Sequence, residues 1–324
     1  MGSERDVKKM TVKTAFTRDD FVGILSQYDL GAYTRSEAVQ QGTVQTNFFI
    51  QTTQGKLVFR YYENRSEESV LFESDLLAYL TEHHYPCPVQ VKDTQGAYVG
   101  TYHHKPYVIL EFLRGRHIEH PGIHHWQQLV QKVAELQKLS KGFRSQYTPY
   151  RWNYDPDLCR ALARAEATRV NTKSAREKSA WLEQELTTLD LPSSLPKGIC
   201  HCDLHFSNVL FRGNEFVALL DFDDANYTFL QFDLVGLIEY WAWPHPAEML
   251  DMTKARSIVQ EYMMHRPLSP IEQRHLYDVF KLSILFDCVW YFERGAVNDF
   301  REKRKMDAST GPGRQKFFDE LFQK

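Results

Sequence analysis

Three polar side chains with complementary chemistry lie in one segment, residues 198–225, with the sequence GICHCDLHFSNVLFRGNEFVALLDFDDA. Asp203 carries a carboxylate of the kind that takes a proton from a hydroxyl group within hydrogen-bonding reach. Asn208 and Asp221 carry amide and carboxylate oxygens, which are the hard ligands that Mg²⁺ prefers. The segment therefore combines a candidate base with candidate metal ligands.

A β-hairpin is the element that must position these side chains. Residues 209–211 and 216–220 are apolar and predict two strands, and the polar residues between them predict the turn. Asp203 and Asn208 come before the first strand, whereas Asp221 ends the second. We therefore expect the three side chains to lie at one end of the hairpin.

The spacing matches the phosphoryl-transfer pattern H-x-D-x-x-x-x-N followed by a metal-binding Asp. HCDLHFSN at 201–208 and LLDFDD at 219–224 resemble the aminoglycoside phosphotransferase family, whose members have a protein-kinase-like fold and phosphorylate small molecules. Cys202 stands where this family usually has Gly and protein kinases have Arg, and Asp223 replaces the glycine of DFG. The resemblance implies that ATP is the phosphoryl donor and that Mg²⁺ binds at the ligands named above.

Other interpretations of the same segment are a plain hairpin, a zinc site and an inactive ATP-binding protein. Any single acidic residue here would suit a solvated hairpin, but the joint pattern favours a kinase. No second Cys or His pair occurs at zinc spacing, which argues against a zinc site at Cys200, His201, Cys202 and His205. A pseudokinase would usually lack one of the three polar residues, and all are present.

Composition and charge limit the protein class. The chain has 324 residues, of which 43% are hydrophobic and 25% charged, as is typical of globular proteins. A net charge of −3 gives no basic surface for nucleic acid, and no apolar run approaches the length that spans a bilayer. Five irregularly spaced cysteines predict reduced thiols and a cytoplasmic location, and the N-terminus lacks the apolar core of a secretory signal. The oligomeric state stays open.

Residues 1–114 predict a strand-rich lobe. Strands are expected over 38–50 (two strands around Gly42), 56–62, 89–91, 97–101 and 107–112, and helices over 19–28 and 68–83. By the resemblance, Gly42 and Thr43 occupy the place of the phosphate-covering loop, and Arg60 stands where protein kinases have a phosphate-binding Lys. Glu73 is its expected partner. The resemblance also places the adenine against the backbone of Glu111, Phe112 and Leu113.

Residues 115–324 predict a helical lobe, with helices over 126–141, 156–170, 175–189, 233–243, 247–265 and 270–295. The change from strands to helices predicts an α+β protein with a protein-kinase-like bilobal fold. Only ten residues separate Asp221 from Phe232, too few for the activation segment that seats a peptide in protein kinases. The acceptor is therefore expected to be a small molecule with a hydroxyl group. Asp233 is expected to support the catalytic loop.

The acceptor has several candidates. Within the family the layout is most similar to type II homoserine kinases, and such a substrate needs an acid for its ammonium group and a base for its carboxylate. Available residues are Glu239, Arg151, Arg160 and Arg294. Segment 233–243 also resembles choline and ethanolamine kinases, in which an aromatic cage would hold the ammonium group. Aromatic candidates, which would equally suit a core, are Tyr240, Trp241, Trp243, Trp290 and Tyr291. An aminoglycoside is a further alternative. The substrate candidates retained are Asp223, Glu239, Tyr240 and Trp241.

Overall fold

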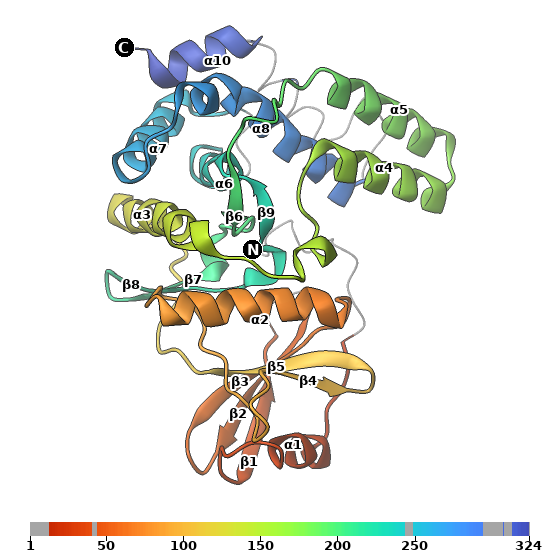
Figure 1. The fold of residues 1–324 in the computed structure, drawn as a ribbon, viewed down its shortest axis with the longest axis vertical. Coiled ribbons are helices and arrows are strands. Elements are labelled where there is room, and N and C mark those ends of the chain that lie inside the picture. Colours follow the sequence, from red (N-terminus) through yellow and green to blue (C-terminus); the bar gives the residue numbers. More distant parts are fainter. Residues whose placement is uncertain (1–12, 41–43, 244–248, 294–306, 308–312, 324) are drawn as a thin grey trace.

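The computed structural model describes residues 13–40, 44–243, 249–293, 307 and 313–323. Its N-terminal part is rich in strands and its C-terminal part is mainly helical, and the two parts stack along the long axis of the molecule (Figure 1). The predicted bilobal α+β architecture is thereby confirmed. The proposed boundary at residue 114 falls between the last strand of the sheet and the first long helix of the C-terminal lobe. Within the described residues, no helix is both long enough and apolar enough to cross a membrane.

The N-terminal sheet has five strands in the order β1-β2-β3-β5-β4, and all neighbours are antiparallel. The strands are β1 Tyr33–Ala38, β2 Thr46–Thr52, β3 Lys56–Tyr61, β4 Val99–Tyr102 and β5 Lys105–Glu111. One face of β3 packs on α1 (Arg18–Leu25) through Leu57, Phe59 and Tyr61. Because successive side chains of a strand point to opposite faces, Val58 and Arg60 share the other face, on which α2 (Glu67–Glu82) packs.

Helix α2 joins the two lobes. Its N-cap is Ser66, whose side chain accepts a hydrogen bond from the backbone nitrogen of Ser69 and so satisfies one of the free donors of the first turn. Val70 of α2 packs against the sheet, whereas Phe72 and Leu76 belong to the core of the helical lobe. The helix therefore lies between the sheet and the helical lobe (Figure 1) and brings Glu73 close to β3.

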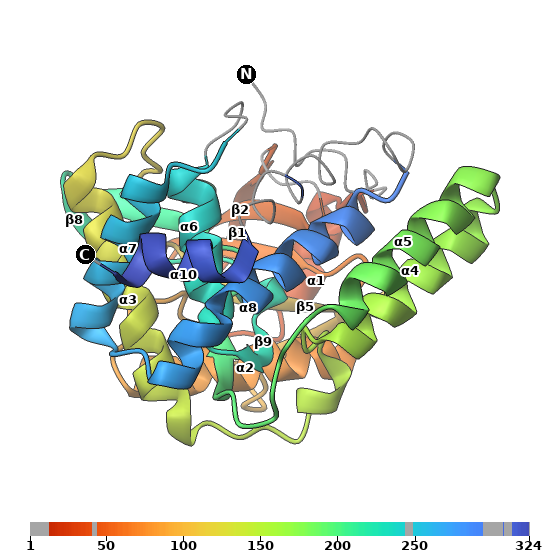
Figure 2. The same cartoon turned by 90° about the horizontal axis from the view of Figure 1, so that it is seen from above.

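The C-terminal lobe is built from helices around α6. The helices are α3 Ile123–Leu139, α4 Pro156–Val170, α5 Lys173–Thr187, α6 Gln231–Ala242, α7 Met252–His265, α8 Pro270–Trp290 and α10 Gly313–Phe322. Leu234, Val235 and Leu237 of α6 are completely buried, which places this helix in the centre of the core. Helices α4 and α5 form an antiparallel hairpin that extends away from the rest of the lobe (Figure 2).

Two small antiparallel ladders position the candidate catalytic segment. Strand β6 (Lys197–Cys200) pairs with β9 (Asn226–Phe229), and β7 (Val209–Arg212) pairs with β8 (Glu215–Leu219). The loop that contains Asp203 and Asn208 connects β6 to β7, and the turn that contains Asp221 connects β8 to β9. Both connections therefore begin in one ladder and end in the other, which brings their side chains together.

Several predicted bounds were wrong. The first predicted strand begins at Ala38, which is where strand β1 ends. The prediction missed β1 because its residues are mostly polar and exposed at the edge of the sheet. The strand expected over 89–91 is reduced to a single bridge between Gln90 and Leu110. Strand β9 and helix α10 were not predicted.

Candidate active site

The loop of residues 201–208 is held by buried polar groups. Asp233 of α6 accepts hydrogen bonds from the backbone nitrogens of His201 at 3.0 Å and Cys202 at 2.9 Å. Burial raises the pKa of Asp233. The Nε2 atom of His201 lies 2.8 Å from the carbonyl of Leu220 and donates to it, so that Nδ1 accepts from the backbone nitrogen of Asp203 at 3.3 Å. Asp233 thus has the supporting position expected for it, and His201 joins the loop to the end of β8.

The Asp203 carboxylate is oriented through both of its oxygens. Asn208 donates from Nδ2 to Oδ2 of Asp203 and to its backbone carbonyl, each at 2.9 Å. The Tyr240 hydroxyl donates to Oδ1 at 3.1 Å. Since Asn208 uses its amide nitrogen here, its Oδ1 atom is the one that it can offer to a metal ion. The sequence alone could not establish this orientation of the amide.

Asp221 combines an unusual backbone with an ion pair between the lobes. Its φ of 62° lies in the left-handed region, which non-glycine residues seldom adopt and which is common at functional sites. The carboxylate is 40% exposed and forms an ion pair with Nη2 of Arg60, whose side chain is 11% exposed. Arg60 of the sheet therefore reaches across the cleft to the metal-ligand candidate.

Glu73 does not have the partner that we expected. Among the described residues the ion pair of Arg60 is with Asp221, and Oε2 of Glu73 is buried without a hydrogen bond. Burial raises the pKa of the Glu73 carboxyl to about 7, although the nearby charge of Arg60 acts in the opposite direction. The predicted contact of Arg60 with Glu73 is thus not formed. The structural reason is that Asp221, 161 residues away, competes successfully for the same guanidinium group.

Asp223, a substrate candidate, is bound within the protein. Its carboxylate accepts hydrogen bonds from Arg65 and from Nε2 of Gln45, and Arg65 also pairs with Asp224. Burial alone would raise the pKa of Asp223, but the charges of Arg65 and Arg60 lower it overall. The carboxylate therefore stays ionised within a set of internal contacts. Sequence reasoning missed Arg65; the pair of acids in LLDFDD was the signal that a buried cation is required nearby.

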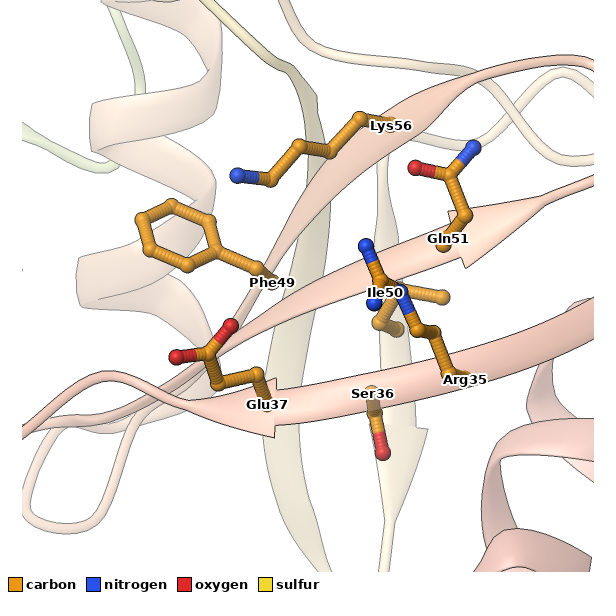
Figure 3. Close-up of a pocket in the computed structure, with 7 residues that line it drawn as sticks. All are labelled: Arg35, Ser36, Glu37, Phe49, Ile50, Gln51 and Lys56. Atoms are coloured by element: carbon orange, nitrogen blue, oxygen red, sulfur yellow. The ribbon is translucent and has the colours of Figure 1, made fainter.

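A cleft of about 2100 Å³ lies between the lobes and is lined by residues of both. Its apolar lining includes Val58 and Leu110 of the sheet and Leu210 and Leu220 of the helical lobe, and Glu111, Phe112 and Leu113 also line it. The ammonium group of Lys56 lies 4.1 Å from the ring centre of Phe49 and 4.0 Å from that of Phe112. Figure 3 shows Lys56 beside Phe49 on neighbouring strands, and both residues also line a smaller pocket of about 30 Å³. Gly42 and Thr43 lie outside the described residues.

The predicted aromatic residues divide between the cleft and the core. Tyr240, Trp290 and Tyr291 line the cleft together with Glu239, which accepts a hydrogen bond from Ser283 at 3.0 Å. Trp241 packs edge-on against Phe206, and Trp243 stacks on Phe280. The five aromatic candidates therefore do not form a single cage.

The thiols and imidazoles of this segment have other contacts. Cys200 is completely buried and its thiol lies 3.4 Å from the carbonyl of Phe229, while the sulfur of Cys202 accepts from Asn226 at 3.3 Å. None of the five cysteines, all of which lie within the described residues, forms a disulfide. In the part of the chain that the structure covers, no three or more His, Cys, Asp or Glu side chains are grouped to hold a metal ion. The amide and carboxylate of Asn208 and Asp221 instead match Mg²⁺, which usually takes one or two carboxylates and completes its shell with water and phosphate oxygens.

Comparison with known proteins identifies the family of the chain. Residues 36–267 match the model of the phosphotransferase enzyme family (APH). The homoserine kinase of Rhodospirillum rubrum is 33% identical over 267 residues, which cover 81% of each chain. An amicoumacin kinase solved in complex with AMP-PNP, Ca²⁺ and Ami has a TM-score of 0.67 at 14% identity and 94% coverage of both chains. Choline kinase from Cryptosporidium parvum has a TM-score of 0.60 at 13% identity, covering 94% of this chain and 95% of the other. These structures share the kinase-like fold, and the family match shows that the chain belongs to the phosphotransferase enzyme family and is a small-molecule kinase.

Proposed function

We propose that the protein transfers the γ-phosphoryl group of ATP to the hydroxyl group of a small amine, with an amino acid such as homoserine as the first candidate. The observation that carries the proposal is the Asp203 carboxylate, which Asn208 and Tyr240 orient in the same cleft as the pair of Arg60 and Asp221. A base and a phosphate-binding cation on opposite walls of one cleft are the arrangement that phosphoryl transfer requires.

Each side chain then has a defined task. Asp203 accepts the hydroxyl proton of the acceptor or orients that hydroxyl for attack. Arg60 binds phosphate oxygens through its planar guanidinium group, with Glu73 behind it on α2. Asn208 and Asp221 would hold Mg²⁺, which when bound neutralises charge on the phosphates.

The nucleotide is proposed to occupy the apolar end of the cleft. Val58, Leu110 and Leu210 offer apolar surfaces for a purine ring, and the backbone of residues 111–113 provides the hydrogen-bonding groups nearby. Gly42 and Thr43 are retained as proposed phosphate contacts. The complex of the related amicoumacin kinase with AMP-PNP and Ca²⁺ supports ATP and a divalent cation as the cofactors.

The acceptor end of the cleft favours a positively charged group. Glu239 and Asp287 line the cleft together with the rings of Trp290 and Tyr291, which suits an ammonium ion. The homoserine kinase relative supports an amino acid. The carboxylate of an amino acid also needs a cation, and two of the predicted arginines are already engaged. Arg151 contacts backbone carbonyls and Ser69, and Arg160 pairs with Glu183 and Asp157. Arg294 lies outside the described residues.

Choline and ethanolamine are therefore the second candidates, because the aromatic and acidic lining satisfies them without a cation. Aminoglycosides, whose amines are numerous, are the third. We also propose a cytoplasmic location, which five cysteines without a disulfide support.

The test is ADP release with Mg²⁺ and ATP across homoserine, serine, choline, ethanolamine and an aminoglycoside. We expect turnover with homoserine, and the Asp203→Asn variant should lose about 10²-fold or more in kcat while binding ATP normally. Turnover with choline alone would replace the first acceptor by the second. An Asp203→Asn variant with unchanged kcat would contradict the role of Asp203.

A further inference from the structure

The residues that follow Asp221 are held by a side chain from the opposite lobe. Arg65 lies between β3 and α2, and its guanidinium group contacts the 3₁₀ turn η5 (Phe222–Asp224). Nε lies 2.9 Å from Oδ1 of Asp223, and Nη2 lies 3.2 Å from Oδ2 of Asp223 and 2.6 Å from Oδ1 of Asp224. Bidentate pairs between arginine and carboxylate are strong and directional. Arg65 therefore fixes two consecutive residues directly after the metal-ligand candidate.

These contacts are shielded from solvent. The exposed fractions of the side chains are 13% for Arg65, 10% for Asp223 and 18% for Asp224, so water screens their charges only in part. Gln45, also in the N-terminal lobe, donates to Oδ2 of Asp223 at 2.9 Å and accepts from the backbone nitrogen of Glu63 at 2.8 Å. We call Arg65, Gln45, Asp223 and Asp224 the Arg65 clamp.

Asp221 needs support of this kind. Its backbone is in the left-handed region, a conformation that persists only where the surroundings determine it. Its carboxylate pairs with Arg60, but a metal ligand must turn the same carboxylate toward the metal. The contact with Arg60 therefore cannot be what keeps Asp221 in place when the cleft is loaded. The Arg65 clamp can keep Asp221 in place, since it holds Asp223 and Asp224, which follow Asp221 in the sequence. It uses none of the carboxylate oxygens of Asp221.

We propose that the Arg65 clamp positions Asp221 for metal-assisted phosphoryl transfer, with Arg65 as a positioning residue. The inference rests on the proposed function of the cleft. Arg65 and Gln45 belong to the N-terminal lobe, whereas Asp223 and Asp224 belong to the C-terminal lobe. The clamp therefore also sets the separation between Arg60 on the sheet and Asp221. A displacement of 1 Å between reacting groups can lower turnover by about 10²-fold.

The variants must separate positioning from stability. Arg65→Met keeps the length of the side chain but removes both ion pairs, and Arg65→Lys restores one charge without the bidentate geometry. Arg314→Met is the matched control, because Arg314 makes a bidentate pair with the completely buried Asp278, on α10 and α8 rather than at the turn after Asp221. Both Met variants thus remove an arginine from a buried carboxylate.

The first measurement is AMP-PNP binding as a function of Mg²⁺ concentration, which needs no acceptor. We expect Arg65→Met to raise the Mg²⁺ concentration for half-maximal binding by about tenfold or more, with Arg65→Lys in between. Arg314→Met should lower the melting temperature and leave the Mg²⁺ requirement unchanged. In turnover, Arg65→Met should lower kcat with little change in the KM of the acceptor.

Two results would overturn the proposal. One is an unchanged Mg²⁺ requirement in Arg65→Met, and the other is an equal rise in Arg314→Met. If Arg65→Met does not fold, Asp224→Asn removes one ion pair while keeping the pair with Asp223, and an unchanged requirement in that variant counts equally against the clamp. If the wild-type protein phosphorylates none of the acceptors, the acceptor assignment fails, whereas the AMP-PNP titration still decides on the clamp.

Discussion

At the scale of single residues, the catalytic loop contains a backbone conformation that its side chain does not favour. Cys202 has a φ of 63°, in the left-handed region, and occupies the position where the resemblance to the family predicts Gly. Glycine adopts this conformation without steric cost, whereas a side chain at Cβ costs about 1 kcal/mol or more there. The sulfur of Cys202 recovers part of that cost through its contact with Asn226.

Substitutions at Cys202 should separate backbone strain from catalysis. We expect Cys202→Gly to fold and to retain kcat within a few-fold, because the loop geometry is kept by Asp233 and His201. Cys202→Val should lose about 2 kcal/mol or more of folding stability, since a β-branched residue is strongly disfavoured at positive φ. Urea denaturation compares the three proteins. Equal stability of the Val and wild-type proteins would show that the loop can relax.

Glu73 predicts a pH dependence of stability. Its pKa is raised from 4.5 to about 7 in the folded protein, so that the folded state binds one more proton than the unfolded state between these values. The contribution of Glu73 to stability is therefore complete below pH 4.5 and is lost as the pH rises to about 7, by up to roughly 3 kcal/mol.

The measurement is the free energy of unfolding of wild-type protein and Glu73→Gln from pH 4 to pH 8. We expect the difference between them to change across this window, with the wild-type protein losing stability relative to Glu73→Gln as the pH rises. Titrating groups that do not interact with Glu73 are common to both proteins and cancel in the difference. A difference that is constant with pH would mean that Glu73 has the same pKa in the folded and unfolded states.

At the scale of elements, the sequence patterns predicted helices that local signals define and missed strands that depend on distant partners. Helix α4 was predicted at its observed bounds, Pro156–Val170, because Asp155 caps its start, Pro156 follows in the first turn and Asn171 ends it in the left-handed conformation. Strand β9 was missed because it has only four residues and pairs with β6, which precedes it by 26 residues or more. Short strands that depend on distant partners carry little periodicity of their own.

The same distinction holds within the site. Asp203, Asn208 and Asp221 were located by a spacing pattern, since the loop and the hairpin that carry them are continuous in sequence. The partner of Arg60 was wrongly expected to be Glu73, and Arg65 was not foreseen. Arg65 and Asp223 are 158 residues apart, and no spacing rule connects them. Ion pairs of this kind follow from how the lobes pack, and patterns within a single sequence do not reveal that packing.

Arg151, in the C-terminal lobe, also holds the turn after Asp221. Its buried guanidinium group donates to the carbonyls of Ala225 and Asp223 and to the backbone and side-chain oxygens of Ser69 on α2. Arg151→Met would leave these buried acceptors without donors, at a cost of about 1–3 kcal/mol for each group. We expect a loss of stability of about 3 kcal/mol or more, measured by urea denaturation. Arg164→Met, which removes an arginine exposed on α4, should change stability by less than about 1 kcal/mol. Similar losses in both variants would contradict the structural role of Arg151.

At the scale of the whole molecule, the two lobes are joined by more than the connection after β5. Ion pairs and hydrogen bonds link Arg60 to Asp221, Arg65 to Asp223 and Asp224, and Arg151 to Ser69. Helix α2 adds apolar contacts, since Phe72 and Leu76 belong to the core of the helical lobe. Lobes coupled in this way should unfold together, because the loss of one lobe would leave the buried charges of the other without partners.

This coupling can be measured because the tryptophans are unevenly distributed. All six tryptophans follow residue 114, so that their fluorescence reports mainly on the helical lobe, and Trp152 in addition contacts Arg65 of the N-terminal lobe. Hydrogen exchange of the β3 amides reports on the sheet. In wild-type protein we expect both probes to give the same urea midpoint. In a variant that combines Arg65→Met with Arg151→Met, β3 should lose protection at a lower urea concentration than the fluorescence transition. Two separate transitions in wild-type protein would show instead that the lobes fold independently and that the contacts between them add little.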